Sequence, residues 1–158
     1  MRNIWFKKVK EPYGWMGNMA PYPITYKGKV WRTSEALFQS LRYADPAIIE
    51  QIRQQKSPMG AKLVAKISVN MVHRVIDAMS PQDVLNMEMC VLLKFQQHPD
   101  IAKLLKATNP NPIYEDATNR NKVNDLFWGA QRDPNNPERP INGQNKMGEI
   151  LMRVRKII

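Results

Sequence analysis

The sequence contains one cysteine, two histidines and no long apolar run. Cys90 has no second cysteine with which to form an intrachain disulfide, and its place in an apolar helical pattern indicates a small core residue rather than a nucleophile. No apolar stretch approaches the roughly 20 residues that span a bilayer, and residues 1–10 lack the apolar segment of a signal peptide. These absences predict a cytoplasmic protein that has no membrane partner.

The scarcity of metal-binding residue types limits the chemistry further. His73 and His98 lie 25 positions apart, outside any HxxxH or CxxC pattern, so we expect neither a metal nor another cofactor. The chain also has no Walker loop and no GxGxxG motif. A bound phosphate would therefore be held by side chains and helix N-termini.

Positive charge, in contrast, is abundant. The chain has 24 Lys and Arg residues against 14 Asp and Glu residues, which gives a formal net charge of +10. Such a charge favours anionic ligands, namely nucleic acids, nucleotides or sugar phosphates. A basic surface without a specific ligand is the simpler alternative.

Length and pattern predict a single domain over residues 1–158. Two short β-type segments, Ile24–Tyr26 and Lys29–Trp31, flank Lys27-Gly28 and predict a hairpin. Helices are predicted over residues 33–43, after the dipeptides Asp45-Pro46, Ser57-Pro58 and Ser80-Pro81, after Pro99, and at the C-terminus, where Met147, Ile150 or Leu151, Val154 and Ile158 form one stripe.

Two further segments complete the predicted fold. In the helix after Pro81, the apolar stripe is expected at Leu85, Met89 and Leu92, backed by Val84, Val91 and Phe95. Residues 109–143 are dense in Asn, Pro, Asp and Arg, and only residues 123–128 are apolar, which indicates a long functional loop. The expected fold class is α+β, a mostly helical domain with a small N-terminal β-sheet.

Glu35 is the acidic residue of most interest. It lies in the predicted first turn of a helix, near Trp31 and Phe38. A carboxyl group in apolar surroundings can have a raised pKa and act as an acid or a base. A first-turn glutamate also interacts favourably with the helix dipole, so the pattern alone supports a catalytic and a structural interpretation equally.

Asp125 is the second candidate acid, at the start of the sequence Asp-Leu-Phe-Trp-Gly that ends at Gly129. Aromatic faces such as that of Trp128 stack on bases, and carboxylates bind ribose hydroxyls, which suits a nucleotide or sugar pocket. The alternative is an apolar plug that anchors the loop.

Three other residues are weaker candidates. Lys62 lies one turn into the helix after Ser57-Pro58, where a lysine is usually solvated. Trp15 and Asn18 lie in the turn-rich N-terminal segment, where asparagine is a common turn former.

Together these motifs resemble the NADAR (YbiA-like) family. Residues 31–40, WRTSEALFQS, resemble the family signature of tryptophan or tyrosine followed by Pro-Thr-x-Glu-His-x-Phe-Gln-Ala. Further blocks occur in the family's order at residues 17–18, 57–62, 94–99, 125–129 and 143–148. The likeness covers about residues 14–156, nearly the whole chain.

The resemblance implies a YbiA-like fold and an N-glycosidase activity. Family members are similar to enzymes that cleave ribosylamine-type bonds in early riboflavin intermediates or that remove ADP-ribose from guanine bases. The implied partner is a phosphorylated ribosyl or ADP-ribosyl small molecule, or an ADP-ribosylated nucleic acid, which agrees with the positive charge.

The chain departs from the family pattern at four places. Arg32, Ala36 and Gln131 stand where the family has proline, histidine and glycine, and relatives have an Asp-Trp pair near Ala78-Met79. These departures concern the substrate more than the reaction class. If the missing histidine contacts the leaving base in relatives, this chain holds a different base.

The resemblance and the chemistry of N-glycoside cleavage together suggest roles for these residues. Glu35 is expected to be the central carboxylate, with Asp125 as its partner or as a ligand of the ribose hydroxyls. Lys62 offers another route, a Schiff base with an opened ribosyl aldehyde. The expected substrate-binding residues are Trp15, Asn18, Trp128, Gly129 and Asn145. We expect Glu35, Asp125 and Trp128 to share one cleft.

Two non-catalytic functions remain open. One is a nucleic-acid-binding domain, and the other is a domain that binds ADP-ribose without cleaving it. Lys and Arg are spread through every segment rather than forming one stripe, which favours an enzyme over a nucleic-acid-binding domain. Both acids are retained, which argues against binding without cleavage.

Overall fold

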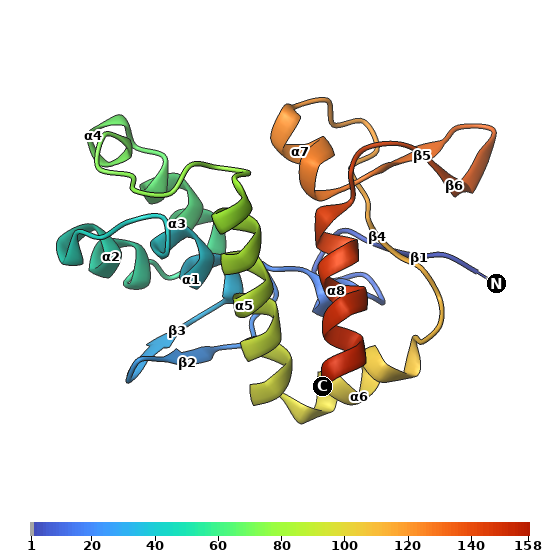
Figure 1. Cartoon of the computed structure of the whole chain (residues 1–158), viewed down its shortest axis with the longest axis horizontal. Helices are drawn as coiled ribbons and strands as arrows, with labels where there is room; N and C mark the ends of the chain where they lie inside the picture. Colours follow the sequence, from blue (N-terminus) through green and yellow to red (C-terminus); the bar gives the residue numbers. More distant parts are fainter. Residues whose placement is uncertain (1) are drawn as a thin grey trace. The chain divides into compact units, whose positions relative to one another are not determined.

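The computed structural model describes residues 2–158 and shows a mostly helical chain with three two-stranded sheets (Figure 1). The predicted α+β class is confirmed, although strands also occur outside the N-terminal region. The described residues form two compact units, Asn18–His98 and the residues up to Gly17 together with Pro99–Ile158. The single domain over residues 1–158 stays a prediction. Within residues 2–158, no helix is both long and apolar enough to cross a membrane.

The Asn18–His98 unit begins with the predicted hairpin. β2 (Ile24–Tyr26) pairs antiparallel with β3 (Lys29–Trp31), and Ile24 lies opposite Trp31. Lys27 and Gly28 have positive φ angles of 48° and 78°, as the two central residues of a type I′ turn require. Because Ile24 and Trp31 are both buried, this end of the hairpin belongs to the core.

Helices of this unit begin where their capping residues predict. The first-turn backbone N–H groups donate hydrogen bonds to the side chains of Thr33, Asp45, Ser57 and Ser80. These residues precede α1 (Ser34–Ser40), α2 (Pro46–Arg53), α3 (Pro58–Ala65) and α5 (Pro81–Gln97). The short α4 (Ser68–Met71) follows α3.

α1 is the central helix of the unit. It contacts α2, α3 and α5, which are grouped around it in Figure 1. All seven residues of α1 are buried, including the polar Ser34, Glu35, Gln39 and Ser40. Buried polar groups require hydrogen-bond partners inside the protein, so the surroundings of this helix contain a polar network as well as an apolar core.

The buried face of α5 differs from the predicted one. The expected stripe is wrong in part, because Leu85 is 58% exposed, whereas Val91 and Phe95 are buried as predicted. The buried positions are Asp83, Met87, Cys90, Val91, Lys94 and Phe95. Two charged residues thus lie on the inner face, where Asp83 forms an ion pair with Arg42.

The other unit is built on a parallel strand pair that the sequence analysis missed. β1 (Ile4–Phe6) pairs with β4 (Ile113–Glu115), and Ile4 lies opposite Ile113. α8 (Lys146–Ile157) packs against β4, α6 (Pro99–Ala107) and α7 (Val123–Trp128). Its buried apolar residues include Met147, Ile150, Leu151 and Val154, as predicted. Ile158, the last residue of the predicted stripe, follows α8 and is half-buried.

The prediction of one long loop over residues 109–143 is wrong in part. This segment contains β4, α7 and an antiparallel pair formed by β5 (Gln131–Asp133) and β6 (Asn136–Asn142). The register of the β5–β6 pair is irregular, and β6 contains two prolines, which cannot donate to a strand ladder. Such strands lack the alternating pattern by which a strand is predicted.

Candidate active site

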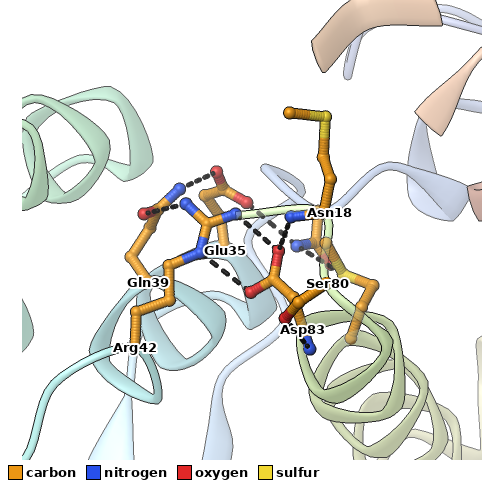
Figure 2. Close-up of polar contacts among 8 residues, drawn as sticks. Asn18, Glu35, Gln39, Arg42, Ser80 and Asp83 are labelled. Atoms are coloured by element: carbon orange, nitrogen blue, oxygen red, sulfur yellow. Dashed lines mark hydrogen bonds and ion pairs between the residues drawn. The ribbon is translucent and has the colours of Figure 1, made fainter. Parts of the chain in front are cut away.

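The carboxylate of Glu35 is held inside the Asn18–His98 unit by two side-chain amides. Glu35 lies in the first turn of α1 and is 8% exposed. The Nδ2 of Asn18 donates to its Oε2 at 3.0 Å, and the Nε2 of Gln39 donates to its Oε1 at 3.1 Å. Figure 2 shows Glu35 between these two residues. Each carboxylate oxygen therefore has a neutral donor that fixes its direction.

The Asn18 amide is itself oriented by Ser34. The hydroxyl of Ser34 donates to the Oδ1 of Asn18 at 2.5 Å, so the Nδ2 of Asn18 points toward Glu35. The backbone N–H of Glu35 also donates to the carbonyl of Asn18 at 3.1 Å. Asn18 and Glu35 are both predicted site residues, and these hydrogen bonds bring them together.

A buried ion pair that was not predicted from the sequence lies next to Gln39. The Nε and Nη2 of Arg42 donate to the two carboxylate oxygens of Asp83 at 2.9 and 2.8 Å, and the two residues are 4% and 0% exposed. The Nη1 of Arg42 also donates to the Oε1 of Gln39 at 3.3 Å. Figure 2 shows Arg42 bridging Gln39 and Asp83.

The Asp83 carboxylate has a further partner at the start of α5. The backbone N–H of Met79 donates to its Oδ2 at 2.8 Å. Met79 has a positive φ of 62°, which is a strained conformation for this residue type. It also lies where relatives were expected to carry an Asp-Trp pair, so the departure from the family pattern falls beside this network.

Cys90 lies on the inner face of α5, and the structure confirms it as a core residue. It is fully buried. Burial raises the pKa of its thiol, and the carboxylates of Glu35 and Asp83 raise it further. Because a thiolate is the nucleophilic form of cysteine, these surroundings make Cys90 unreactive.

Lys94, one turn further along α5, is a titratable group that the sequence analysis passed over. It is 1% exposed, and burial lowers the pKa of its ammonium group to about 7. Its Nζ lies 5.4 Å from the ring centroids of Tyr22 and Phe95. The residue types gave no signal, because a lysine in a helix is usually solvated.

Lys62 lies in the last turn of α3 and is half-buried. α3 packs against α1, the helix that carries Glu35. Among residues 2–158, the Lys62 ammonium group forms no hydrogen bond or ion pair. Its role as a Schiff-base or phosphate-binding lysine stays a prediction.

The remaining predicted site residues belong to the other unit. Asp125 lies in the first turn of α7 and is half-buried. Within the part of the chain that the structure describes, its carboxylate has no hydrogen-bond or ion-pair partner. Trp128 is 7% exposed and packs edge-to-face on Phe127, with ring centroids 4.9 Å apart. Trp15 lies in a short 3-10 helix, Gly14–Met16, and is half-buried.

Asn145 and Gly129 occupy tightly constrained positions in this unit. The Nδ2 of Asn145 donates to the carbonyl of Ile113 at 2.9 Å, and its Oδ1 accepts from the N–H of Glu115 at 3.1 Å. The Asn145 side chain thus joins the start of α8 to β4. A Cβ at Gly129 would lie 2.7 Å from the carbonyl oxygen of Glu115, so only glycine fits there.

The predicted site residues thus divide between the two units. Asn18, Glu35 and Lys62 belong to one unit. The other unit contains Trp15, Asp125, Trp128, Gly129 and Asn145. The single cleft that would contain Glu35, Asp125 and Trp128 stays a prediction. Across residues 2–158, no three His, Cys, Asp or Glu side chains come together as metal ligands.

The sequence of this chain is similar to those of proteins named as N-glycosidases. N-glycosidase YbiA of Escherichia coli (strain K12) is 30% identical over 151 residues, which cover 96% of this chain and 85% of that protein. An N-glycosidase of Nostoc punctiforme is 31% identical over 158 residues, which cover 98% of this chain and 92% of that protein. A riboflavin biosynthesis protein of Vibrio vulnificus is 28% identical over 154 residues, which cover 97% of this chain but 38% of that protein.

The fold and the family agree with these relatives. The NMR structure of the E. coli protein YbiA matches this chain with a TM-score of 0.77 at 28% identity, over 99% of this chain and 86% of that chain. The NADAR domain matches residues 5–158. The chain therefore belongs to the NADAR family of N-glycosidases, hydrolases that act on N-glycosyl bonds.

Proposed function

We propose that the chain hydrolyses the N-glycosidic bond of a phosphorylated ribosyl substrate, with Glu35 as the central carboxylate. The substrate is either an ADP-ribosylated guanine or a ribosylamine intermediate of the riboflavin pathway. The observation that carries the proposal is the buried Glu35 carboxylate, which two oriented amides hold in place. A riboflavin biosynthesis protein among the relatives supports the second substrate, and the net charge of +10 suits a phosphate group in either.

The reaction breaks the bond between the anomeric carbon and the leaving nitrogen. The electron pair leaves with the nitrogen, which takes up a proton, while a water oxygen forms the new bond to carbon and gives up a proton, so that one water molecule is consumed. Positive charge develops on the sugar in the transition state. A carboxylate such as Glu35 stabilises that charge strongly, because its surroundings are shielded from water and its orientation is fixed before the reaction.

The other site residues have supporting roles in this proposal. Asp125, half-buried and without a protein partner within residues 2–158, binds ribose hydroxyls or acts as the second carboxylate. Lys62 binds phosphate or forms a Schiff base with the opened sugar. Trp15 and Trp128 are stacking faces for the base. Asn18 orients the Glu35 carboxylate, and Gly129 and Asn145 shape the part of the other unit that carries Asp125 and Trp128.

The test is turnover on a defined set of compounds. The protein is incubated separately with ADP-ribosylated guanosine, ADP-ribose, NAD and ribosylamine intermediates of the riboflavin pathway, and the released bases are identified by mass spectrometry. We expect release of a free base or amine from one of these compounds. Binding without release from any of them would favour a domain that only recognises ADP-ribose, and a steep salt dependence of DNA binding would favour a nucleic-acid-binding domain.

The Glu35→Gln variant tests the central residue. The amide keeps the shape of the side chain but cannot carry the negative charge, so turnover should fall by roughly a hundredfold or more while circular dichroism stays native. Glu11→Gln, the same change at an exposed position, is the matched control. Near-native turnover of a folded Glu35→Gln protein would overturn the assignment.

A further inference from the structure

The Glu35 carboxylate lies at one end of a continuous chain of side-chain hydrogen bonds. Gln39 donates to Glu35, Arg42 donates to Gln39, and Arg42 forms two hydrogen bonds with Asp83 (Figure 2). Residues of α1, of the turn that follows α1, and of α5 are thus joined through polar atoms alone. The far end of this chain is the buried ion pair.

Stability alone does not account for this ion pair. Asp83 is fully buried and Arg42 nearly so, and the loss of hydration of two buried charges often cancels their attraction. Apolar residues of similar volume would stabilise such a site about as well. The pair therefore provides something that apolar residues cannot, which is a set of directed donors.

The direction of those donors determines how the Gln39 amide is placed. A guanidinium group has only donors, so the Oε1 of Gln39 must face the Nη1 of Arg42. The Nε2 of Gln39 must then face Glu35. Without Arg42, the two ends of the amide could exchange, and an oxygen facing the carboxylate would repel it. The two hydrogen bonds between Arg42 and Asp83 keep the guanidinium group from turning away.

We propose that Arg42, anchored by Asp83, is a positioning residue that acts through Gln39 to fix the orientation of the Glu35 carboxylate. This inference rests on the proposed role of Glu35 in catalysis. Arg42 does not touch the substrate in this scheme. Its effect on turnover passes entirely through the Gln39 amide.

The first test separates positioning from folding. The single variant Arg42→Met leaves a buried carboxylate without its partner and is expected to destabilise the protein. The double variant Arg42→Met/Asp83→Asn removes both charges and keeps an acceptor for the Met79 N–H, so it should unfold at nearly the native urea concentration. We expect its kcat to fall on the order of tenfold, with KM within about twofold of the native value, because substrate binding is intact. A native kcat in the folded double variant would overturn the proposal.

The matched control is Arg53→Met/Glu50→Gln. Arg53 and Glu50 form an ion pair three residues apart on α2, and both side chains reach solvent. The same kinds of substitution there remove a charge pair from the same unit without touching Gln39. Turnover should stay native, and an equal loss in this control would show a general effect of charge removal and overturn the proposal.

The second test asks whether Arg42 acts through Gln39. Gln39→Met should lower kcat about as much as the Arg42→Met/Asp83→Asn variant does. Combining all three substitutions should lower kcat no further, because residues in one network are not additive. If the losses multiply instead, Arg42 affects turnover independently of Gln39, and the proposal is overturned.

The third test does not depend on turnover. In the native protein, the side-chain amide signals of Gln39 in a ¹H–¹⁵N spectrum should shift when Glu35 is replaced by Ala, because the Nε2 hydrogen bond is lost. In the Arg42→Met/Asp83→Asn protein the same replacement should produce less than half that shift. An undiminished shift would refute the positioning role. This result holds even if Glu35→Gln keeps native turnover, which would refute the proposed function alone.

Discussion

Lys94→Met should flatten the rise in stability that the native protein shows between about pH 7 and pH 10.5. The ammonium group of Lys94 lies on the inner face of α5 with 1% of the residue exposed. Burial lowers its pKa from 10.5 to about 7. The folded protein therefore releases a proton that the unfolded chain still holds over this whole interval.

The sign and size of the effect follow from this difference in bound protons. Below about pH 7 both the folded and the unfolded state hold the proton, so Lys94 does not contribute to the pH dependence of stability there. Between about pH 7 and 10.5 the unfolded chain binds more protons, so the free energy of unfolding rises with pH by up to about 1.4 kcal/mol per pH unit. The whole rise is at most about 5 kcal/mol.

The assay is urea denaturation at pH 6, 7, 8, 9 and 10 for the native protein and for Lys94→Met. Differences between the two proteins cancel the contributions of the other titrating groups. The native protein should gain stability relative to the variant over pH 7 to 10, with unchanged m values. Lys103→Met, at an exposed position of α6, is the control and should follow the native curve. Parallel curves for native protein and Lys94→Met would refute the reasoning.

Four further predictions concern the site and its support. Lys62→Met separates two routes: a Schiff base would give a borohydride-trapped adduct in the native protein and none in the variant, whereas a phosphate-binding lysine would give a raised KM with little change in kcat. Normal kinetics and no adduct would remove Lys62 from the site. Asp125→Asn should lower kcat/KM on the order of tenfold, less than Glu35→Gln does, and an unchanged kcat/KM would contradict its proposed role. Asn145→Ala should destabilise the protein by about 2–4 kcal/mol in urea denaturation, because one buried and one partly buried backbone group lose their partners; a loss below about 1 kcal/mol would contradict that account. Chelating agents should leave turnover unchanged, and a loss that one divalent ion restores would show that a metal takes part.

Local structure was predictable where a few adjacent residues determine it. The pairs Asp45-Pro46, Ser57-Pro58 and Ser80-Pro81 mark the first residues of α2, α3 and α5. In each, the capping side chain and the proline φ angle favour a helix start without help from distant residues. The hairpin at Lys27-Gly28 is equally local, because its turn requires two positive φ angles.

Structure that depends on distant partners was not predictable. β1 and β4 are strands of three residues whose paired positions Ile4 and Ile113 are far apart in the chain. Three residues are too few to show an alternating pattern. The face of α5 was misjudged for a related reason, since the partner of Asp83 is Arg42, which precedes it by 41 positions.

The candidate site was partly visible in the sequence. Glu35, Gln39 and Arg42 are spaced at i, i+4 and i+7, which places them along one side of a helix and its continuation. That spacing could have suggested a polar network next to Glu35. No spacing could have shown that Lys94 is buried, because its environment is made by residues such as Tyr22 from a different segment.

Because the chain contains a single thiol, the labelling of Cys90 can be used to measure local opening of the protein. Cys90 is sealed within α5, and its raised pKa keeps it protonated in the closed state. A thiol-specific reagent such as iodoacetamide can therefore react only during moments when the Asn18–His98 unit opens. The labelling rate, compared with that of a free thiol, gives the fraction of time spent open, without any engineered probe. Mass spectrometry of the labelled protein would give this fraction for every variant described above, with and without substrate.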